Sequence, residues 1–208
     1  MVEFFRAGGP FMFLLLLTSI VGLTFIVERG LALRWSKVVP PSVEKALEDF
    51  QAGQDVSSLK QICLLKPSAL SRLLLVAAEH LNWPKGENEG AVQTHARHEI
   101  VQLERGLVVL EIVVGIAPLL GLVGTIHGLI TLFAELGTVG MSDNAAMAKG
   151  IAIALNTTLM GLLIAIPSLI AWSYYTKKVE MLAVEMESIC DEFVRRQYRA
   201  VEAGQTGS

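Results

Sequence analysis

Polar side chains inside long apolar segments are the residues of this chain that could do chemistry. Thr125 lies in one such segment, and Asn156, Thr157 and Thr158 lie in another. A polar group inside a membrane is costly unless it bonds a neighbouring helix or lines a wet path. On helical wheels, Thr125 and Thr158 each share a face with small residues, where another helix can approach. A hydroxyl can also bond a carbonyl of its own helix, so packing alone is the alternative explanation.

His127 is the titratable side chain in the same segment as Thr125. Two helical steps separate the two residues by about 200°, so they cannot face the same feature. A histidine that titrates near neutrality could relay protons. It could equally hydrogen-bond a carbonyl of a neighbouring helix, and the sequence leaves both roles open.

Small residues mark the faces on which these segments should pack. Gly121, Gly124 and Gly128 follow helical spacing, and Gly124 with Gly128 forms a pair that permits close backbone approach. Such glycines are typical of helix packing. We assign a packing role to Pro118, Gly121, Gly124, Gly128 and Gly161.

The composition favours a membrane protein and excludes several other classes. Of 208 residues, 52% are hydrophobic and only 18% are charged, and the mean hydropathy is +0.52. A net charge of −3 gives no basic field for nucleic acid. We expect no metal or other cofactor and no enzymatic activity, because no ligand set, phosphate loop or nucleophile–base arrangement is present. Cys63 and Cys190 are expected to be free thiols.

Three uncharged apolar runs, at 7–27, 112–134 and 150–176, are each long enough to cross a bilayer. The first is expected to be a retained helix rather than a cleaved signal, because no small-residue cleavage site follows it before Glu28. Most lysines and arginines lie between the first two runs or after the third. The positive-inside rule therefore places the N-terminus outside and the C-terminus in the cytoplasm.

The fold expected is all-α, with the second and third spans extended into a cytoplasmic helical bundle. The predicted segments are 1–33 with the first span, a cytoplasmic region at 34–110, spans at 111–136 and 150–176, a periplasmic loop at 137–149 and a cytoplasmic tail at 177–208. Pro40 and Pro41 indicate a helix start, Gly53 a break, and 83–86 a turn.

Apolar stripes with helical spacing extend the two spans beyond the membrane. One runs from Val92 to Leu110, and the other runs from Val179 to Phe193. The stripes could pack on each other within one subunit, or also between subunits, and the sequence favours neither.

Two long motifs carry a family resemblance. The sequence APLLGLVGTIHGLI at 117–130 and the sequence GIAIALNTTLMGLLIAIP at 150–167 resemble the second-span and third-span signatures of the MotA/TolQ/ExbB proton-channel family. The order of the motifs and the three-span topology are similar to the ExbB and TolQ branch. The resemblance covers essentially the whole chain.

The resemblance implies an ion-conducting stator subunit in a bacterial inner membrane, forming a homopentamer around two copies of a single-span partner similar to ExbD or TolR. An aspartate of that partner would carry the ion, and an effector similar to TonB or TolA would take up the mechanical work. Thr125 and Thr158 match the family threonines that face this aspartate, and Thr157 and Asn156 join them in the expected ion path.

The chain departs from the family pattern at two positions. Ile153 stands where well-known members have glutamate, and His127 stands where they have tryptophan. The adjacent hydroxyls of Thr157 and Thr158 also make sodium a possible coupling ion, because hard oxygen ligands suit small cations. The alternative function from another class is a non-conducting membrane scaffold, in which the polar residues only pack helices and the cytoplasmic part recruits a partner.

Overall fold

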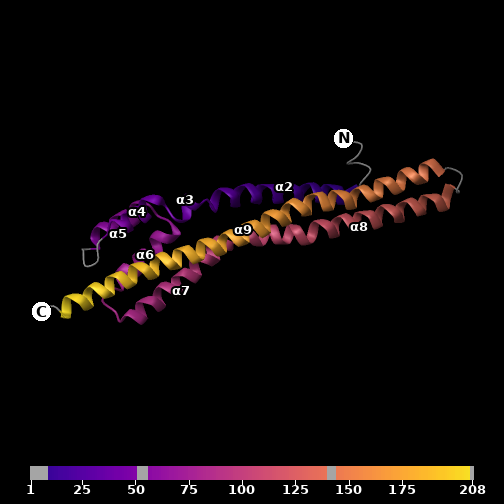
Figure 1. Cartoon of the computed structure of the whole chain (residues 1–208). Helices are drawn as coiled ribbons and strands as arrows, with labels where there is room; N and C mark the ends of the chain where they lie inside the picture. The colour runs from indigo at the N-terminus through magenta and orange to yellow at the C-terminus, as the bar shows by residue number, and fades with distance from the viewer. Residues whose placement is uncertain (1–8, 51–55, 140–143, 207–208) are drawn as a thin grey trace. The chain divides into compact units, whose positions relative to one another are not determined.

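A computed structural model describes residues 9–50, 56–139 and 144–206 of the chain. The helices are α2 (Gly9–Ala32), α3 (Trp35–Val38), α4 (Pro41–Glu48), α5 (Ser57–Leu65), α6 (Ala69–Glu79), α7 (Lys85–Glu104), α8 (Leu107–Val139) and α9 (Asn144–Thr206) (Figure 1). These described ranges hold no strand. The all-α prediction is therefore confirmed.

Three helices are long and apolar enough to cross a membrane, as the sequence predicts. The candidate spans are Pro10–Ala32, Leu107–Ala134 and a part of Met147–Ala200. The last of these lies in α9, a continuous helix of 63 residues. An extension of the third span into a helical bundle is therefore confirmed.

Helix boundaries differ from the sequence expectation at the loop between the last two spans. Residues 137–149 were expected to form this loop, but α8 continues to Val139 and α9 already begins at Asn144. Alanines at 145, 146 and 148 favour the early start of α9, because alanine has the highest helix propensity. The expected break at Gly53 lies outside the described residues.

The chain divides into two compact units, which are described separately. The first, called the membrane unit, contains Met1–Arg29 and Gly106–Tyr174. The second, called the bundle unit, contains Gly30–Arg105 and Tyr175–Ser208. Both α2 and α9 contribute residues to each unit, since the division falls inside these helices.

In the membrane unit, α2 packs on α8 and α9 through a small residue. A Cβ atom added at Gly22 would lie 3.2 Å from Val113 Cγ1 of α8 and 3.2 Å from Ser168 Oγ of α9. Met12 and Leu15 are buried on the same helix, whereas Phe13 and Leu23 are exposed. This arrangement gives α2 one packed face and one broad apolar face suited to lipid.

The bundle unit has a core of larger apolar side chains. Its α7 and α9 stripes meet there, because Val92 and Ala96 of α7 share one cluster with Leu182, Met186 and Phe193 of α9. The structure thus shows the stripes packed within one subunit. Further core residues come from α4, α5 and α6 and include Val43, Leu59, Leu70, Leu73, Leu74 and Ala77.

A two-residue turn separates the extension of the second span into α7 and α8. Glu104 ends α7 and Leu107 begins α8. Gly106 lies beneath the side chain of Arg29, since a Cβ atom there would overlap Arg29 Nε. Glycine leaves the space that this arginine occupies, while Arg29 also pairs with Glu28.

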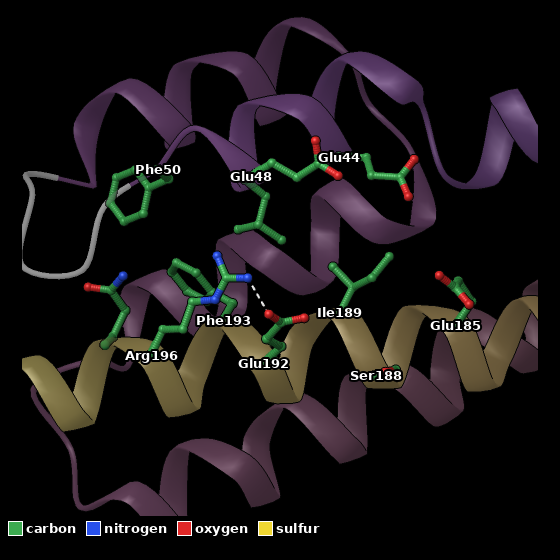
Figure 2. A pocket seen from close by; sticks show the side chains of 11 residues that line it. Glu44, Glu48, Phe50, Glu185, Ser188, Ile189, Glu192, Phe193 and Arg196 are labelled. Carbon is green, nitrogen blue, oxygen red and sulfur yellow. Dashed lines mark hydrogen bonds and ion pairs between the residues drawn. The ribbon is translucent and has the colours of Figure 1, made fainter.

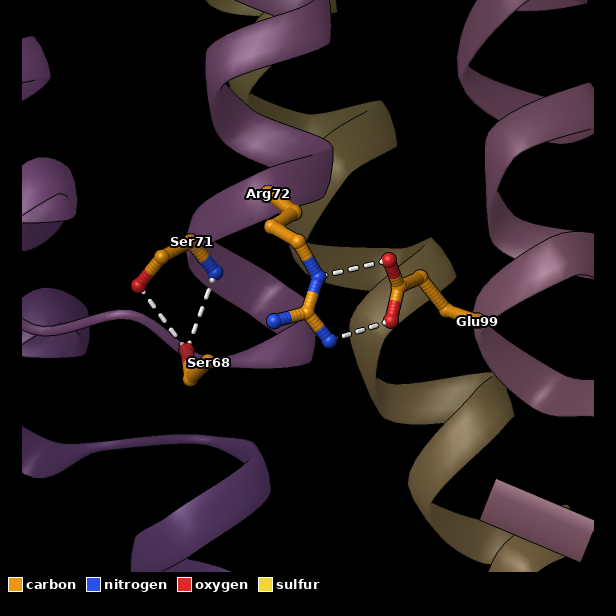
Figure 3. A network of polar contacts seen from close by, with 4 residues as sticks. All are labelled: Ser68, Ser71, Arg72 and Glu99. Carbon is orange, nitrogen blue, oxygen red and sulfur yellow. Dashed lines mark hydrogen bonds and ion pairs between the residues drawn. The ribbon is translucent and has the colours of Figure 1, made fainter. Parts of the chain in front are cut away.

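Polar contacts fix the start of α6 and its packing on α7 (Figure 3). The Ser68 hydroxyl caps α6 by accepting a hydrogen bond from the Ser71 backbone N–H at 3.0 Å. Arg72 of α6 donates from Nε and Nη2 to both carboxylate oxygens of Glu99 on α7, at 2.7 and 2.5 Å. This bidentate bond raises the pKa of the Arg72 guanidinium.

Candidate functional site

Three threonine hydroxyls meet between α8 and α9 in the membrane unit. Thr125 Oγ1 of α8 lies 2.5 Å from Thr158 Oγ1 and 3.2 Å from Thr157 Oγ1 of α9. The Thr125 hydroxyl also lies in donating range of the Ala154 carbonyl, at 2.9 Å. We call Thr125, Thr157 and Thr158 the threonine cluster. The sequence pattern predicts these residues on facing helices, and in the structure their hydroxyls are in direct contact.

The threonine cluster contains more acceptors than its protons can satisfy. The Gly121 carbonyl lies 3.2 Å from Thr125 Oγ1, 3.3 Å from Thr157 Oγ1 and 3.2 Å from Thr158 Oγ1. The Ala154 carbonyl lies 2.6 Å from Thr157 Oγ1. Each hydroxyl has one proton to donate but two lone pairs. The cluster is therefore rich in oxygen acceptors, and its hydroxyls can rotate among several partners.

Glycine makes this contact possible, because the two helix backbones nearly touch. A Cβ atom at Gly121 would lie 2.8 Å from the Thr157 carbonyl oxygen, and one at Gly161 would lie 2.5 Å from the Ala117 carbonyl oxygen. Any larger side chain would separate the helices and pull the hydroxyls apart. Such small-residue interfaces are how helices approach closely in lipid.

The remaining glycines of this face serve the same interface. A Cβ atom at Gly124 would lie 3.1 Å from Thr157 Oγ1 and 3.2 Å from Phe11 Cβ of α2. One at Gly128 would lie 3.1 Å from Ala154 Cβ. All three glycines on the predicted face of α8 thus lie against neighbouring helices.

Burial differs within the threonine cluster. Thr157 is 2% exposed and Thr125 is 8% exposed, whereas Thr158 is half-buried. Thr158 is therefore the outermost residue of the cluster. Thr125 and Thr157 form the inner part of the same cluster.

Two other candidates from the sequence lie apart from the threonine cluster. His127 is exposed, and its ring stacks at a tilt on Phe11 of α2, with centroids 5.5 Å apart. Asn156 is half-buried, and within the described part of the chain no hydrogen bond joins its amide to the cluster. The structure therefore brings together three of the four residues expected in the ion path, and it leaves His127 on another face, as the helical wheel predicts.

A proline interrupts the backbone hydrogen bonds of each inner helix, α8 and α9. Pro118 lies inside α8 and is half-buried, and Pro167 lies inside α9. A proline has no backbone N–H, so the carbonyls of Val114 and Leu163 lose their helical donors. Together with the Gly121 and Ala154 carbonyls, these groups are polar features of the membrane unit that side-chain patterns alone did not reveal.

Ser168 is a buried polar residue that the sequence analysis did not single out. It is 2% exposed, and its hydroxyl donates to the Ile164 carbonyl of its own helix at 2.8 Å. Its position inside the third apolar run could have marked it in the sequence as a polar residue within a span. Because the hydroxyl is satisfied within α9, Ser168 serves packing against Gly22 of α2.

No carboxylate occurs in the sequence of the three apolar runs, and no group of three or more His, Cys, Asp or Glu side chains suited to a metal ion occurs among the described residues. The threonine cluster consists of hydroxyl and carbonyl oxygens, which can accept hydrogen bonds.

The bundle unit contains a cavity of about 180 Å³ between α4 and α9 (Figure 2). Its carboxylates are Glu44 and Glu48 of α4 and Glu185 and Glu192 of α9, and Glu192 is paired with Arg196. Apolar side chains complete the lining, among them Phe50 and Phe193, whose rings lie 6.1 Å apart. Acidic groups around an aromatic floor suit a basic side chain with an aliphatic stem.

The fold and the threonine cluster define a helical membrane protein whose second and third spans enclose a polar site. The sequence profile of the MotA/TolQ/ExbB proton channel family matches residues 68–188, which include both of these spans. The chain belongs to this family, as the two motifs predict.

Individual relatives agree with this assignment. The chain is 32% identical over 181 residues to a "Putative biopolymer transport protein ExbB homolog" of Methanothermobacter thermautotrophicus, covering 86% of this chain and 64% of the relative. It is 34% identical over 181 residues to "Putative biopolymer transport protein ExbB-like 1" of Synechocystis, covering 83% and 69%. It is 30% identical over 204 residues to "Tol-Pal system protein TolQ" of Pseudomonas aeruginosa, covering 91% and 87%.

By their names, these relatives are biopolymer-transport proteins of the ExbB type and a Tol-Pal system protein. The chain spans less than two thirds of the archaeal relative's length but most of the TolQ relative.

Proposed function

We propose that this chain is an ion-conducting stator subunit that converts an ion-motive force into mechanical work for envelope transport or maintenance. The single observation that carries the proposal is the threonine cluster. Three hydroxyls and two carbonyls gather between apolar helices, where polar groups are costly and usually functional. Family membership supports the same role.

The threonine cluster supplies the wall of the path, and a partner chain supplies the charge. A single-span subunit similar to ExbD or TolR, with an aspartate in its membrane helix, would place that carboxylate against Thr158. The hydroxyl of Thr158 can donate a hydrogen bond to the ionised carboxylate, and its lone pairs can accept a hydrogen bond from the neutral acid. Moving one charge through 100 mV supplies about 2.3 kcal/mol for this cycle.

The assembly proposed is a homopentamer around two such partners in a bacterial inner membrane. The N-terminus lies in the periplasm and the C-terminus in the cytoplasm, which places the bundle unit in the cytoplasm. An effector similar to TonB or TolA would receive the work. Exposed apolar residues such as Leu119 and Ile126 of α8, and Leu155 and Ile166 of α9, give the second and third spans surfaces for neighbouring copies or lipid.

Replacing Thr158 with valine tests the path most directly. Valine keeps the shape of threonine but removes the hydroxyl, so the expected result is a loss of gradient-dependent activity by at least about tenfold, equivalent to about 1.4 kcal/mol. Proton flux into liposomes that contain this chain with its partner measures the effect. Thr131→Val is the matched control, because the Thr131 hydroxyl is exposed and bonds only the His127 carbonyl of its own helix among the described contacts.

The result that would reject the proposal is full flux in both Thr125→Val and Thr158→Val. Equal losses in Thr158→Val and Thr131→Val would also reject it, because the effect would then not depend on the threonine cluster. Flux driven by a sodium gradient at constant pH identifies sodium as the coupling ion, and flux that follows the pH gradient identifies the proton.

A second candidate function is a non-conducting membrane scaffold, which the acidic cavity of the bundle unit favours. A cytoplasmic partner with basic side chains would fit Glu44, Glu48 and Glu185. Purification with co-expressed neighbouring gene products distinguishes the two functions. A single-span companion with a membrane carboxylate supports the stator, whereas its absence together with a cytoplasmic companion that is lost on Glu44→Gln supports the scaffold.

A further inference from the structure

One surface of the bundle unit combines exposed apolar and basic side chains. Leu64 and Leu65 end α5 and are 68% and 77% exposed, which is unusual for two consecutive leucines outside a membrane span. Lys66 follows them directly, while Trp35 and Lys37 on α3 are also exposed. We call Trp35, Lys37, Leu64, Leu65 and Lys66 the leucine–lysine patch.

The two lysines of the leucine–lysine patch lie on one groove. A surface groove of about 450 Å³ is lined by Ser36 and Lys37 on one side and by Lys66 and Pro67 on the other. Among the described residues its lining contains lysines but no carboxylate. The patch is therefore basic, in contrast to the acidic cavity between α4 and α9 of the same unit.

Chain connectivity places Trp35 and Lys37 of the patch only a few residues beyond a candidate membrane span. The membrane-spanning helix α2 ends at Ala32, three positions before Trp35. Its last turn belongs to the bundle unit and lies against α9, because a Cβ atom at Gly30 would stand 2.8 Å from Tyr175 Oη. Helix α5 ends at Leu65, and the next residues, Lys66 and Pro67, share a groove with Lys37 of α3 and with the start of α4 (Figure 1).

The chemistry of the patch fits an anionic lipid surface. Exposed leucines gain free energy when they enter the boundary between headgroups and acyl chains. Lysines bind anionic headgroups with their charged ends while their aliphatic stems stay near the leucines. Tryptophan is enriched at this depth because its ring is apolar and its N–H is polar. No carboxylate in the groove opposes the negative surface.

We propose that the leucine–lysine patch docks on anionic phospholipids of the leaflet at which α2 leaves the membrane. Leu64 and Leu65 insert at the acyl boundary, and Lys37 and Lys66 contact headgroup phosphates. This docking would hold the end of the bundle unit at the membrane surface. This docking does not depend on ion conduction, so its test is independent of the test of the stator proposal.

Spin labels at the two ends of α5 test the docking. Leu65→Cys and Ser58→Cys both replace exposed residues, and Ser58 lies near the start of the same helix. The full chain is placed in nanodiscs with phosphatidylglycerol. The parent chain, treated with the same spin label, measures any background signal from the buried Cys63 and Cys190. The expected result is a label at 65 that oxygen relaxes severalfold more than a water-soluble nickel chelate does, and the opposite ratio at 58.

Charge variants test the lipid specificity. Lys37→Gln combined with Lys66→Gln should reduce the inserted population of the Leu65→Cys label by about 25-fold, or about fivefold for each lysine. Nanodiscs of phosphatidylcholine alone should reproduce this loss with the labelled Leu65→Cys chain that keeps both lysines.

Three results would overturn the proposal. A label at 65 that is as accessible to the nickel chelate as the label at 58 shows a patch in water. A label at 65 that neither reagent reaches shows a patch covered by protein, such as a second copy of this chain. Insertion that is equal in both lipid compositions would remove the role of the lysines and of anionic lipid.

Discussion

The membrane unit and the bundle unit are stabilised by different kinds of packing. Buried side chains between α8 and α9 are small, and they include Ala117, Ala154 and Thr157. The bundle unit instead buries large ones such as Leu182, Met186 and Phe193. Lipid is as apolar as leucine, so helices in a membrane gain by close backbone contact. Helices in water gain by removing large apolar surfaces from solvent.

This difference in packing determines where polar groups are found in each unit. In the membrane unit, close helix contact brings hydroxyls and carbonyls together, so the threonine cluster depends on glycines. In the bundle unit, the polar contacts of Arg72 with Glu99 lie at the edge of a core that is already large. A small steric change should therefore matter most in the first unit and a broken ion pair in the second.

The largest effect is expected from Gly161→Ala. The new Cβ atom would lie 2.5 Å from the Ala117 carbonyl oxygen, a backbone atom that cannot move alone. We expect a destabilisation of about 3 kcal/mol, at the upper end for overpacking, measured by thermal unfolding in detergent. Gly115→Ala is the control, since nothing lies within 4 Å of a Cβ atom there. Equal stability of the two variants would contradict close packing of α8 on α9.

The next effect concerns the thiol of Cys63 in the core of the bundle unit. Burial raises the pKa of this thiol to about 11 from 9.0. A two-unit rise lowers the thiolate fraction at neutral pH by about 100-fold, so maleimide labelling should be at least that much slower than for Gln61→Cys, whose site is exposed. Mass spectrometry measures both rates. Equal rates would show an open core.

The same pKa sets the sign of a pH dependence. Above pH 9 the unfolded thiol loses its proton before the folded one does, so the folded state binds more protons. Stability contributed by the neutral buried thiol should therefore fall as pH rises from about 9 to about 11. Cys63→Ala should remove this part of the decline.

A smaller loss is expected when the ion pair between α6 and α7 is broken. Arg72→Ala leaves the Glu99 carboxylate, 8% exposed, without its bidentate partner. We expect about 2 kcal/mol of destabilisation in chemical unfolding, below the full cost of a buried pair because Arg72 is half-exposed. Lys85→Ala breaks an exposed pair with Glu89 and should cost under about 0.5 kcal/mol. Replacing Arg72 and Glu99 together with leucine should recover most of the loss.

A small stability effect is also expected for Thr125→Val. Hydrogen bonds between membrane helices contribute about 0.6 kcal/mol on average, and valine fills the same space. Thermal unfolding should therefore hardly change, although ion flux should be lost. A stability loss near that of Gly161→Ala would show that the threonine cluster serves packing alone, as in a scaffold.

The sequence alone was enough to predict the three spans, the all-α class and the family. The apolar runs are longer than any core helix needs, and the long α9 follows from an uninterrupted helical pattern. The sequence also indicated that Thr125 and Thr158 lie on faces of small residues, because helical periodicity determines which residues share a face.

Tertiary structure decided which of these residues meet. Periodicity cannot give the axial register between two helices, and this register places Thr125 against both Thr157 and Thr158 and leaves Asn156 aside. The Gly121 and Ala154 carbonyls became part of the site for the same reason, since every residue carries such a group and only contact selects one. The leucine–lysine patch likewise joins α3 and α5 only after the chain folds back.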